Sequence, residues 1–189
     1  MKPAEMTNTL TELFGSHVQL LQSGSWQVDT PDFRLLILLS EDQSWLRALL
    51  PIAAAQETQP LVAELLEANF DLTQETRYAL YQEVVWGVFQ HSLETLSPID
   101  FSAALARLVS LHQKGLSDCF NLFVEKRIRQ IIQSAKLQNQ SLETTLRTLE
   151  RLYQEGVMGE LDQGKQSREE TLAAWRRQLE RLWPEVEPE

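Results

Sequence analysis

Three short segments of strand character follow one another closely in the first third of the chain, and they constrain the fold more than any other feature. They run from Ser25 to Val28, from Phe33 to Leu39 and from Trp45 to Ile52. The tetrapeptides DTPD and SEDQ separate them, and both are rich in residues that favour turns. Strands joined by such short turns pair as consecutive antiparallel hairpins. The sequence therefore predicts an antiparallel sheet.

Two helical segments lie on either side of these strands. Apolar residues recur at near-helical spacing from about Thr7 to Ser23, which predicts an amphipathic helix that ends at Gly24. A second helix is expected after the third strand, with Pro60 in its first turn. One face of that helix is marked by Leu61, Leu65 and Phe70.

Two further strands and a third helix follow. Aromatic and β-branched residues concentrate in Thr76 to Gln82 and from Glu83 or Val84 to His91, although the junction between them lacks a good turn dipeptide. The tetrapeptide SPID at 97–100 predicts a helix start, because serine caps free N–H groups and proline suits the first turn. The helical spacing of apolar residues continues past Gly115. Either one long helix carries a tolerated glycine or two helices meet there.

The segment after Gln138 carries two narrow apolar seams on otherwise polar helices. The first seam consists of Leu142, Leu146, Leu149 and Tyr153, and the second of Leu172, Trp175, Leu179 and Leu182. The intervening EGVMGELDQGK contains three glycines and suits a connection, so an antiparallel helical hairpin is expected. We expect this hairpin to pack on the main domain or on a second subunit.

These elements define an α+β fold. An antiparallel sheet of about five strands is expected in the order α-βββ-α-ββ-α, followed by the C-terminal helical hairpin. The expected domains are residues 1–135, which hold the sheet, and residues 136–189, which form the helical extension.

The order helix, three strands, helix, two strands, helix resembles the type III secretion chaperone-like fold, which is shared with the YbjN-like family of small bacterial proteins. The resemblance covers about residues 5–133 and includes the run FRLLILLSEDQSWLRALLPI before the proline-started helix. It implies a small acidic homodimer that binds a client protein, often as an assembly or secretion chaperone. It brings no catalytic motif, and the C-terminal hairpin departs from the usual short chaperone.

Two predicted strands are apolar on both faces, which agrees with a binding role. In the first strand, Leu36 and Leu38 lie on the face opposite to Phe33, Leu35, Ile37 and Leu39. In the second strand, Trp86 lies on the face opposite to Val85. A strand of this kind needs cover on both faces. The hairpin, a second subunit or a client protein could supply the second cover. The candidate interface residues are Leu36, Leu38, Trp86, Leu142, Leu146, Leu149, Leu172, Trp175 and Leu179.

Charge and cysteine content narrow the partners and the compartment. Residues 1–100 hold four basic and fourteen acidic side chains, within a formal net charge of −10 for the whole chain. Such a surface repels phosphate backbones, so no nucleic-acid partner is expected. The longest uncharged apolar run is far shorter than the roughly 20 residues that cross a bilayer. The single Cys119 excludes an intrachain disulfide, and a cytoplasmic location is expected.

The sequence contains no recognisable catalytic or metal-binding pattern. His17, His91 and His112 lack a second ligand at metal-binding spacing, and no glycine-rich phosphate loop occurs. Cys119 is expected to be a buried structural residue. We therefore expect no cofactor and no enzymatic activity, but a protein-binding module, chaperone-like or an adaptor, for a client protein. The alternative is a regulatory or stress-response domain with a small apolar molecule between sheet and helices.

Overall fold

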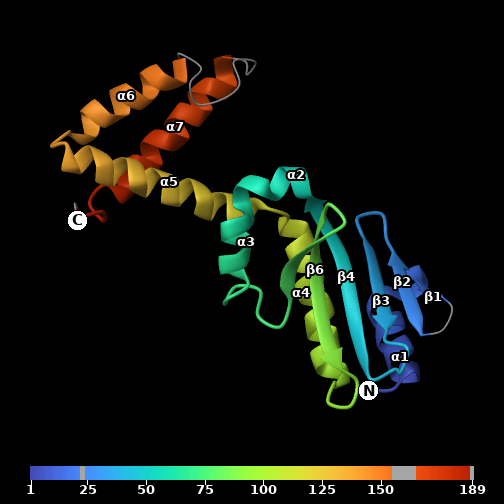
Figure 1. Cartoon of the computed structure of the whole chain (residues 1–189). Coiled ribbons are helices and arrows are strands. Elements are labelled where there is room, and N and C mark those ends of the chain that lie inside the picture. Colours follow the sequence, from blue (N-terminus) through green and yellow to red (C-terminus); the bar gives the residue numbers. More distant parts are fainter. Residues whose placement is uncertain (22–23, 155–164, 188–189) are drawn as a thin grey trace. The chain divides into compact units, whose positions relative to one another are not determined.

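The structure is a computed structural model of the whole chain, shown in Figure 1. It describes the backbone of residues 1–21, 24–154 and 165–187, and the side chains of all of these except 152–154 and 165–172. The chain divides into two compact units, Met1–Phe120 (unit 1) and Asn121–Glu189 (unit 2). This division falls earlier than the expected boundary at 135/136, because residues after Phe120 share a core with the C-terminal helices.

Unit 1 is built on a six-stranded antiparallel sheet with the order β1-β2-β3-β4-β6-β5. The predicted α+β class with an antiparallel sheet is confirmed. The strands are β1 (Val18–Leu20), β2 (Ser25–Asp29), β3 (Arg34–Leu39), β4 (Trp45–Ala54), β5 (Arg77–Tyr81) and β6 (Val84–Ser92). Consecutive strands from β1 to β4 are neighbours, as short turns require, and β6 then pairs with β4 while β5 lies at the edge.

The sixth strand, β1, corrects the expected first helix. The helix α1 covers only Pro3–Phe14, with a proline in its first turn, and it ends at Gly15, whose φ is 58°. The left-handed backbone of this glycine stops the helix at low cost. The chain then extends and pairs with β2, Val18 opposite Val28 and Leu20 opposite Trp26. Strand pairing therefore overrides the helical spacing of the residues after Phe14.

The second helical region is broken into pieces. It comprises α2 (Ala55–Thr58), a 3-10 turn (Gln59–Leu61) and α3 (Val62–Ala68). Pro60 lies in the 3-10 turn, where its missing N–H costs nothing. The predicted face is therefore only partly confirmed. Leu61 and Leu65 are buried, whereas Phe70 lies beyond the end of α3 and is exposed.

The third helix, α4 (Pro98–Lys114), begins as the sequence predicts. The Ser97 hydroxyl accepts the N–H of Asp100 at 3.1 Å and donates to the Asp100 carboxylate at 2.6 Å. Gly115 has a φ of 56° and ends the helix. A separate helix, α5 (Ser117–Leu137), follows. Of the two alternatives for the stretch across Gly115, two helices that meet is therefore the one observed.

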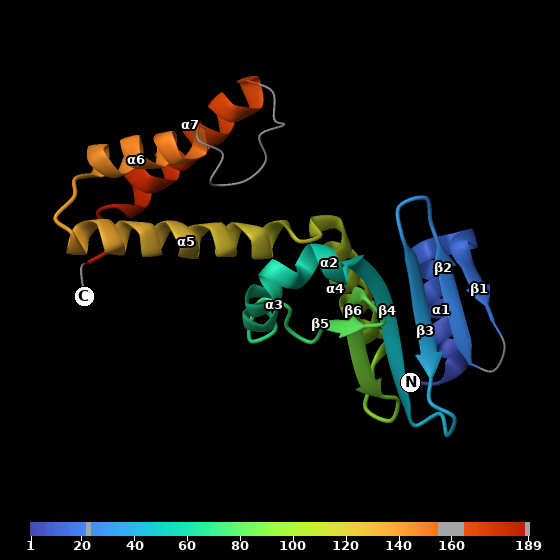
Figure 2. The ribbon, with the colours of Figure 1, turned by 45° about the horizontal axis from the view of Figure 1, so that its top comes forward.

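The core of unit 1 lies between one face of the sheet and the helices α1 and α4 (Figures 1 and 2). Alternate strand residues point into it because successive side chains in a strand face opposite sides. They include Trp26, Ile37, Ala48 and Phe89, which lie side by side across four paired strands. The helices contribute Met6, Leu10, Phe101, Ala104, Leu105 and Leu108.

The turn of the β5–β6 hairpin is formed by residues that rarely adopt its backbone conformation. The two residues between the strands, Gln82 and Glu83, have φ values of 47° and 61°. A two-residue hairpin with both central residues at positive φ is the type I′ turn, which favours Asn-Gly and similar pairs. Here residues with larger side chains adopt this conformation, so the dipeptide carries no turn signature.

Unit 2 contains the C-terminal part of α5 together with α6 (Leu142–Gln154) and α7 (Lys165–Leu182). The predicted helical hairpin is thus observed as α6 and α7, and its connection at 155–164 lies outside the described residues. Ile128 and Ile132 of α5 are fully buried together with Leu179 and Leu182 of α7. Partly buried residues complete this core: Val124, Leu142, Leu146, Leu149, Trp175, Trp183 and Val186.

Candidate protein-binding surfaces

The outer face of the sheet, opposite α1 and α4, carries the strand residues predicted as an interface. Leu36 pairs with Leu49, and Trp86 pairs with Pro51. The side chains of Leu36, Leu38 and Trp86 lie on this face, and all three are half-buried. The sheet thus brings the three predicted residues onto a single surface. Their role in binding stays a prediction.

Polar groups border this outer face. Leu38 lies opposite Arg47, whose guanidinium carbon lies 5.1 Å from the centre of the Trp45 ring. The Trp86 indole N–H donates to the Tyr81 carbonyl at 3.1 Å. The outer face thus combines half-buried apolar side chains with a polar border.

A second apolar surface lies at the opposite edge of unit 1, between α3 and β5. We call it the α3–β5 groove, and it is a hollow of about 80 Å³ lined by Thr58, Val62, Leu65, Leu66, Asn69, Tyr78, Ala79, Leu80 and Val85. Leu66 is 66% exposed and Leu80 is 63% exposed. The neighbouring Tyr81 and Phe70 are 65% and 94% exposed. Large apolar side chains at this level of exposure make the groove a candidate interaction site.

The backbone at this edge is partly closed by a side chain. The Asn69 amide donates to the Tyr78 carbonyl at 3.0 Å, and its oxygen accepts the Tyr78 N–H at 2.8 Å. The pair of bonds imitates a neighbouring strand at Tyr78, one of the two β5 residues whose backbone groups face away from β6. Leu80, two residues on, presents its backbone to the same side. A partner therefore meets the side chains of the groove and one backbone position of β5, Leu80, that Asn69 does not occupy.

The α3–β5 groove was not among the predicted interface residues. In the sequence, Phe70 belongs to the predicted helix face with Leu61 and Leu65. Leu80 lies within a predicted strand and has no feature that sets it apart. The exposure arises because α3 ends at Ala68 and β5 is an edge strand. The sequence feature that could have indicated the groove is the concentration of large apolar residues close to a turn.

The seam residues of the hairpin are brought together in the core of unit 2. Leu142, Leu146, Leu149 and Trp175 are half-buried there, and Leu179 is fully buried. Leu172 and Tyr153 lie outside the described side chains. The seams thus have a partner within unit 2, namely α5. A role of these residues in binding another protein stays a prediction.

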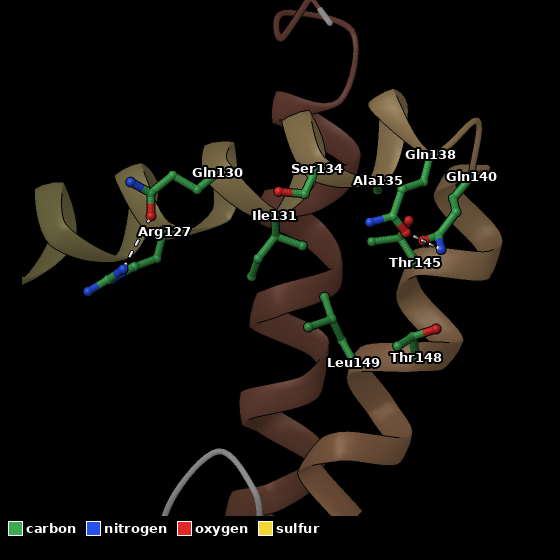
Figure 3. A pocket seen from close by; sticks show the side chains of 10 residues that line it. All are labelled: Arg127, Gln130, Ile131, Ser134, Ala135, Gln138, Gln140, Thr145, Thr148 and Leu149. Atoms are coloured by element: carbon green, nitrogen blue, oxygen red, sulfur yellow. Dashed lines mark hydrogen bonds between the residues drawn. The ribbon is translucent and has the colours of Figure 1, made fainter.

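A hollow of about 370 Å³ lies between α5 and α6 (Figure 3). Ile131 and Leu149 reach into it from the two helices, and amide and hydroxyl side chains surround them. Arg127 donates to the Gln130 side-chain oxygen at 3.2 Å, and Gln140 donates to that of Gln138 at 3.1 Å. The described residues of the lining are neutral apart from Arg127, and they include no carboxylate, cysteine or histidine that could hold a metal ion.

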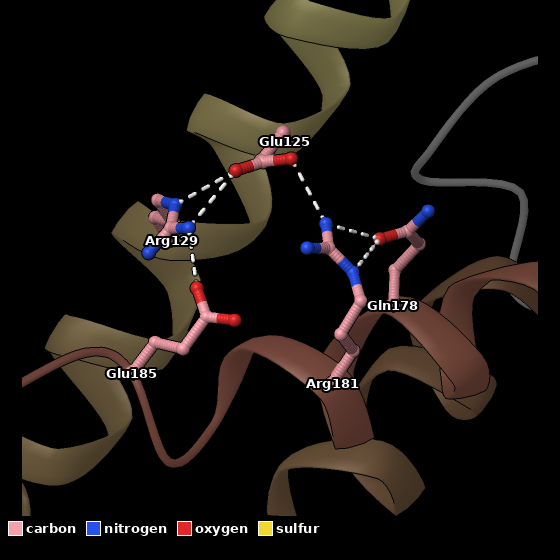
Figure 4. A network of polar contacts seen from close by, with 5 residues as sticks. All are labelled: Glu125, Arg129, Gln178, Arg181 and Glu185. Atoms are coloured by element: carbon pink, nitrogen blue, oxygen red, sulfur yellow. Dashed lines mark hydrogen bonds and ion pairs between the residues drawn. The ribbon is translucent and has the colours of Figure 1, made fainter.

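A network of charged residues joins α5 to α7 and to the segment after α7 (Figure 4). Glu125 accepts from Arg181 at 2.9 Å and from Arg129 at 2.9 Å, and Arg129 also contacts Glu185 at 2.6 Å. The hydrogen bonds from Arg181 and then from Arg129 lower the pKa of Glu125. The carboxylate therefore stabilises the fold above its ordinary pKa, and this contribution is lost as the pH falls through the lowered pKa.

Replacing Arg181 by glutamine is expected to raise the pKa of Glu125 back toward its ordinary value, because its first hydrogen-bond donor is lost. A carbon-13 NMR titration of the glutamate carboxyls measures this pKa. Arg147→Gln is the matched control, because Arg147 contacts Glu143 on the surface of α6. An unchanged Glu125 titration in Arg181→Gln would contradict the network.

The nucleophilic and metal-binding residue types are dispersed. His17, His91 and His112 each bond to a backbone carbonyl in a different part of unit 1. Among the described residues, no three His, Cys, Asp or Glu side chains form a group that could hold a metal ion. Cys119 is buried, and burial raises the pKa of its thiol. A protonated, enclosed thiol is a poor nucleophile.

Several solved structures are similar to this chain. No family model and no curated protein matches the chain. A chain of the crystal structure of the Yersinia pestis type III secretion chaperone SycH in complex with a stable fragment of YscM2 is 17% identical, has a TM-score of 0.47, and covers 60% of this chain and 98% of its own. The ExsC–ExsE complex contains a chain that is 14% identical, with a TM-score of 0.47 and coverages of 60% and 95%.

A third similar structure is the HopA1–SchA chaperone–effector complex, one chain of which is 12% identical, with a TM-score of 0.47 and coverages of 61% and 97%. At these identities the similarity concerns the fold. Among the described residues, no helix is long and apolar enough to cross a membrane.

Proposed function

We propose that this protein is a non-catalytic, chaperone-like module that binds a client protein through the apolar surfaces of unit 1. The observation that carries the proposal is the α3–β5 groove, where Leu66 and Leu80 are each more than 60% exposed beside one another. Burying large aliphatic side chains on a partner releases about 25 cal/mol for each Å² of apolar surface. The half-buried outer face of the sheet offers a second contact surface.

The charge around the groove indicates the chemistry of the client. Glu57, Asp71 and Glu83 are exposed and flank the segments that form the groove. Between residues 55 and 85 the one basic side chain is Arg77, which bonds to the Gln90 side chain. We therefore propose a client segment with apolar side chains flanked by lysine or arginine. Such complementarity raises the association rate and weakens with salt.

A second copy of the chain is the other occupant that the groove would accept, which would give a homodimer. Two acidic surfaces repel one another, so dimerisation should strengthen as salt rises, whereas binding of a basic client should weaken. Light scattering at low and high salt separates the two cases. A dimer that forms at high salt and is lost in Leu80→Ser would assign the groove to self-association.

The direct test uses fluorescent peptides with one apolar core and flanks of lysine, serine or glutamate, titrated with the full chain by anisotropy. The lysine-flanked peptide should bind most tightly, and Leu66→Ser or Leu80→Ser should weaken it by about tenfold or more, as expected for the loss of a buried aliphatic contact. Leu13→Ser is the matched control, since Leu13 is an exposed leucine of α1 in the same unit. Equal binding of all three peptides, or equal loss in Leu13→Ser, would refute the proposal.

A further inference from the structure

One buried hydroxyl in unit 1 has no hydrogen-bond partner. Thr73 is 1% exposed, and its side-chain oxygen is the single buried side-chain N or O atom without a partner among the described residues. The loop around it is fixed, because the Thr73 N–H donates to the Ala68 carbonyl at 3.1 Å and the Thr73 carbonyl accepts from the Thr76 hydroxyl at 2.7 Å. Buried polar groups are rarely left unpaired, so this hydroxyl points to a missing partner.

Thr73 lines a small, largely enclosed pocket, which we call the Thr73 pocket. Its volume is about 100 Å³, and its polar lining comes from Thr73, Tyr78, Arg107, Ser110, Lys114 and Asp118. A water molecule takes about 30 Å³ of liquid volume, so the pocket has room for a few waters or for one small organic acid. The lining combines three hydroxyls with two cations from α4. Hydroxyls and a guanidinium are the groups that bind carboxylates in proteins.

The charged side chains that line the pocket, Arg107, Lys114 and Asp118, sum to a formal charge of +1, and Glu64 lies outside this lining, where its charge acts on Cys119. The Lys114 ammonium lies 2.9 Å from the Asp118 carboxylate, and both side chains are more than half exposed. The Arg107 guanidinium donates to the Gln74 side-chain oxygen and has no carboxylate within 4 Å among the described residues. Glu75 and Asp100 line a neighbouring hollow of about 400 Å³ that Arg107 also borders. This acidic surrounding disfavours a doubly charged ligand.

The remaining groups stay protonated at neutral pH. Burial raises the pKa of the Tyr78 hydroxyl to about 12, and burial also raises the pKa of the Cys119 thiol beside it. Neither group brings a competing negative charge into the pocket. The Tyr78 hydroxyl can donate to a ligand in place of the Cys119 sulfur, which is a weaker acceptor than a carboxylate oxygen.

We propose that the Thr73 pocket binds the carboxylate of a small organic acid. Arg107 supplies the positive charge, and the hydroxyls of Thr73 and Ser110 supply hydrogen bonds. A monoanion matches the single uncompensated cation, whereas a phosphate dianion does not. Tyr78 lines both this pocket and the α3–β5 groove, so an occupied pocket would hold in place one wall of the surface proposed to bind a client. The site itself does not depend on that proposed function.

Sodium acetate is the probe, with sodium chloride at equal ionic strength as the reference and sodium phosphate as the comparison. Amide chemical shifts of the full-length protein are followed by NMR. Acetate should shift the amides of residues 72–78 and 107–111 with saturation. Thr73→Val, which keeps the shape and removes the hydroxyl, and Arg107→Gln should each weaken binding by about tenfold.

Arg34→Gln is the matched control, because Arg34 is an exposed arginine of the same unit paired with Asp29. It should bind acetate as the unaltered protein does. The proposal is overturned if acetate and chloride give equal shifts, if phosphate binds more tightly than acetate, or if Thr73→Val and Arg107→Gln bind acetate unchanged while their spectra remain folded. None of these outcomes bears on peptide binding in the groove, so the two proposals fail separately.

Discussion

Replacing Trp26 by alanine is expected to lower the free energy of unfolding of unit 1 by about 3–5 kcal/mol, the usual range for truncating a large buried aromatic side chain. Trp26 is 1% exposed and lies on the inner face of β2, opposite Ile37. Its indole N–H also donates to the Thr7 hydroxyl at 3.0 Å, which ties α1 to the sheet. Hydrogen exchange of β3 and β4 amides over a urea series measures the loss.

Trp45→Ala is the matched control for this substitution. Trp45 begins β4 and is exposed, and the guanidinium carbon of Arg47 lies 5.1 Å from the centre of its ring. An exposed cation–π contact contributes about 0.5–1 kcal/mol, so the expected change is small. If Trp26→Ala cost no more than Trp45→Ala, the assignment of Trp26 to the core between β2 and α1 would be wrong.

Replacing Leu179 by alanine is expected to destabilise unit 2 by about 2–5 kcal/mol, because the truncation leaves a cavity among fully buried neighbours. Leu179 of α7 has no exposed surface and packs in one cluster with Ile128 and Ile132 of α5. The loss should appear as faster hydrogen exchange in α5, α6 and α7.

Arg177→Ala serves as the comparison, since this exposed residue lies in the same helix and its substitution should change stability by no more than about 0.5 kcal/mol. Unchanged exchange in Leu179→Ala would show that α7 does not dock on α5. It would also reopen the possibility that the seam of α7 serves another protein.

The strands of unit 1 could be predicted closely because their signals are local. Short segments of strand character between turn-rich tetrapeptides placed β2, β3 and β4, and the Ser97 cap placed the start of α4. β1 could not be predicted, because its conformation depends on pairing with β2 and its own residues have helical spacing. The Gln82–Glu83 turn was also obscure, since its positive φ values are imposed by the strands that it joins.

The candidate surfaces were predictable only in part, for a related reason. Apolar residues on both faces of a strand identify Leu36 and Leu38 as needing a second cover. Helical spacing likewise shows which face of a helix is apolar, but it does not show what covers that face. Leu179, a candidate interface residue, lies in the core of unit 2, and its role in binding another protein stays a prediction. Conversely, Leu80 looked like an ordinary strand residue and is exposed, because the sequence does not show which strand is the edge.

The two hydrogen bonds from Asn69 to Tyr78 have a consequence for the selectivity of recognition. An open strand edge can be joined by almost any extended polypeptide, since every chain carries the same backbone groups. By occupying those groups at Tyr78, Asn69 reduces the open backbone on this side of β5 to Leu80, so the side chains of the α3–β5 groove carry most of the choice of a partner. Side chains differ between proteins, so the surface can discriminate among chains that a bare edge would accept alike.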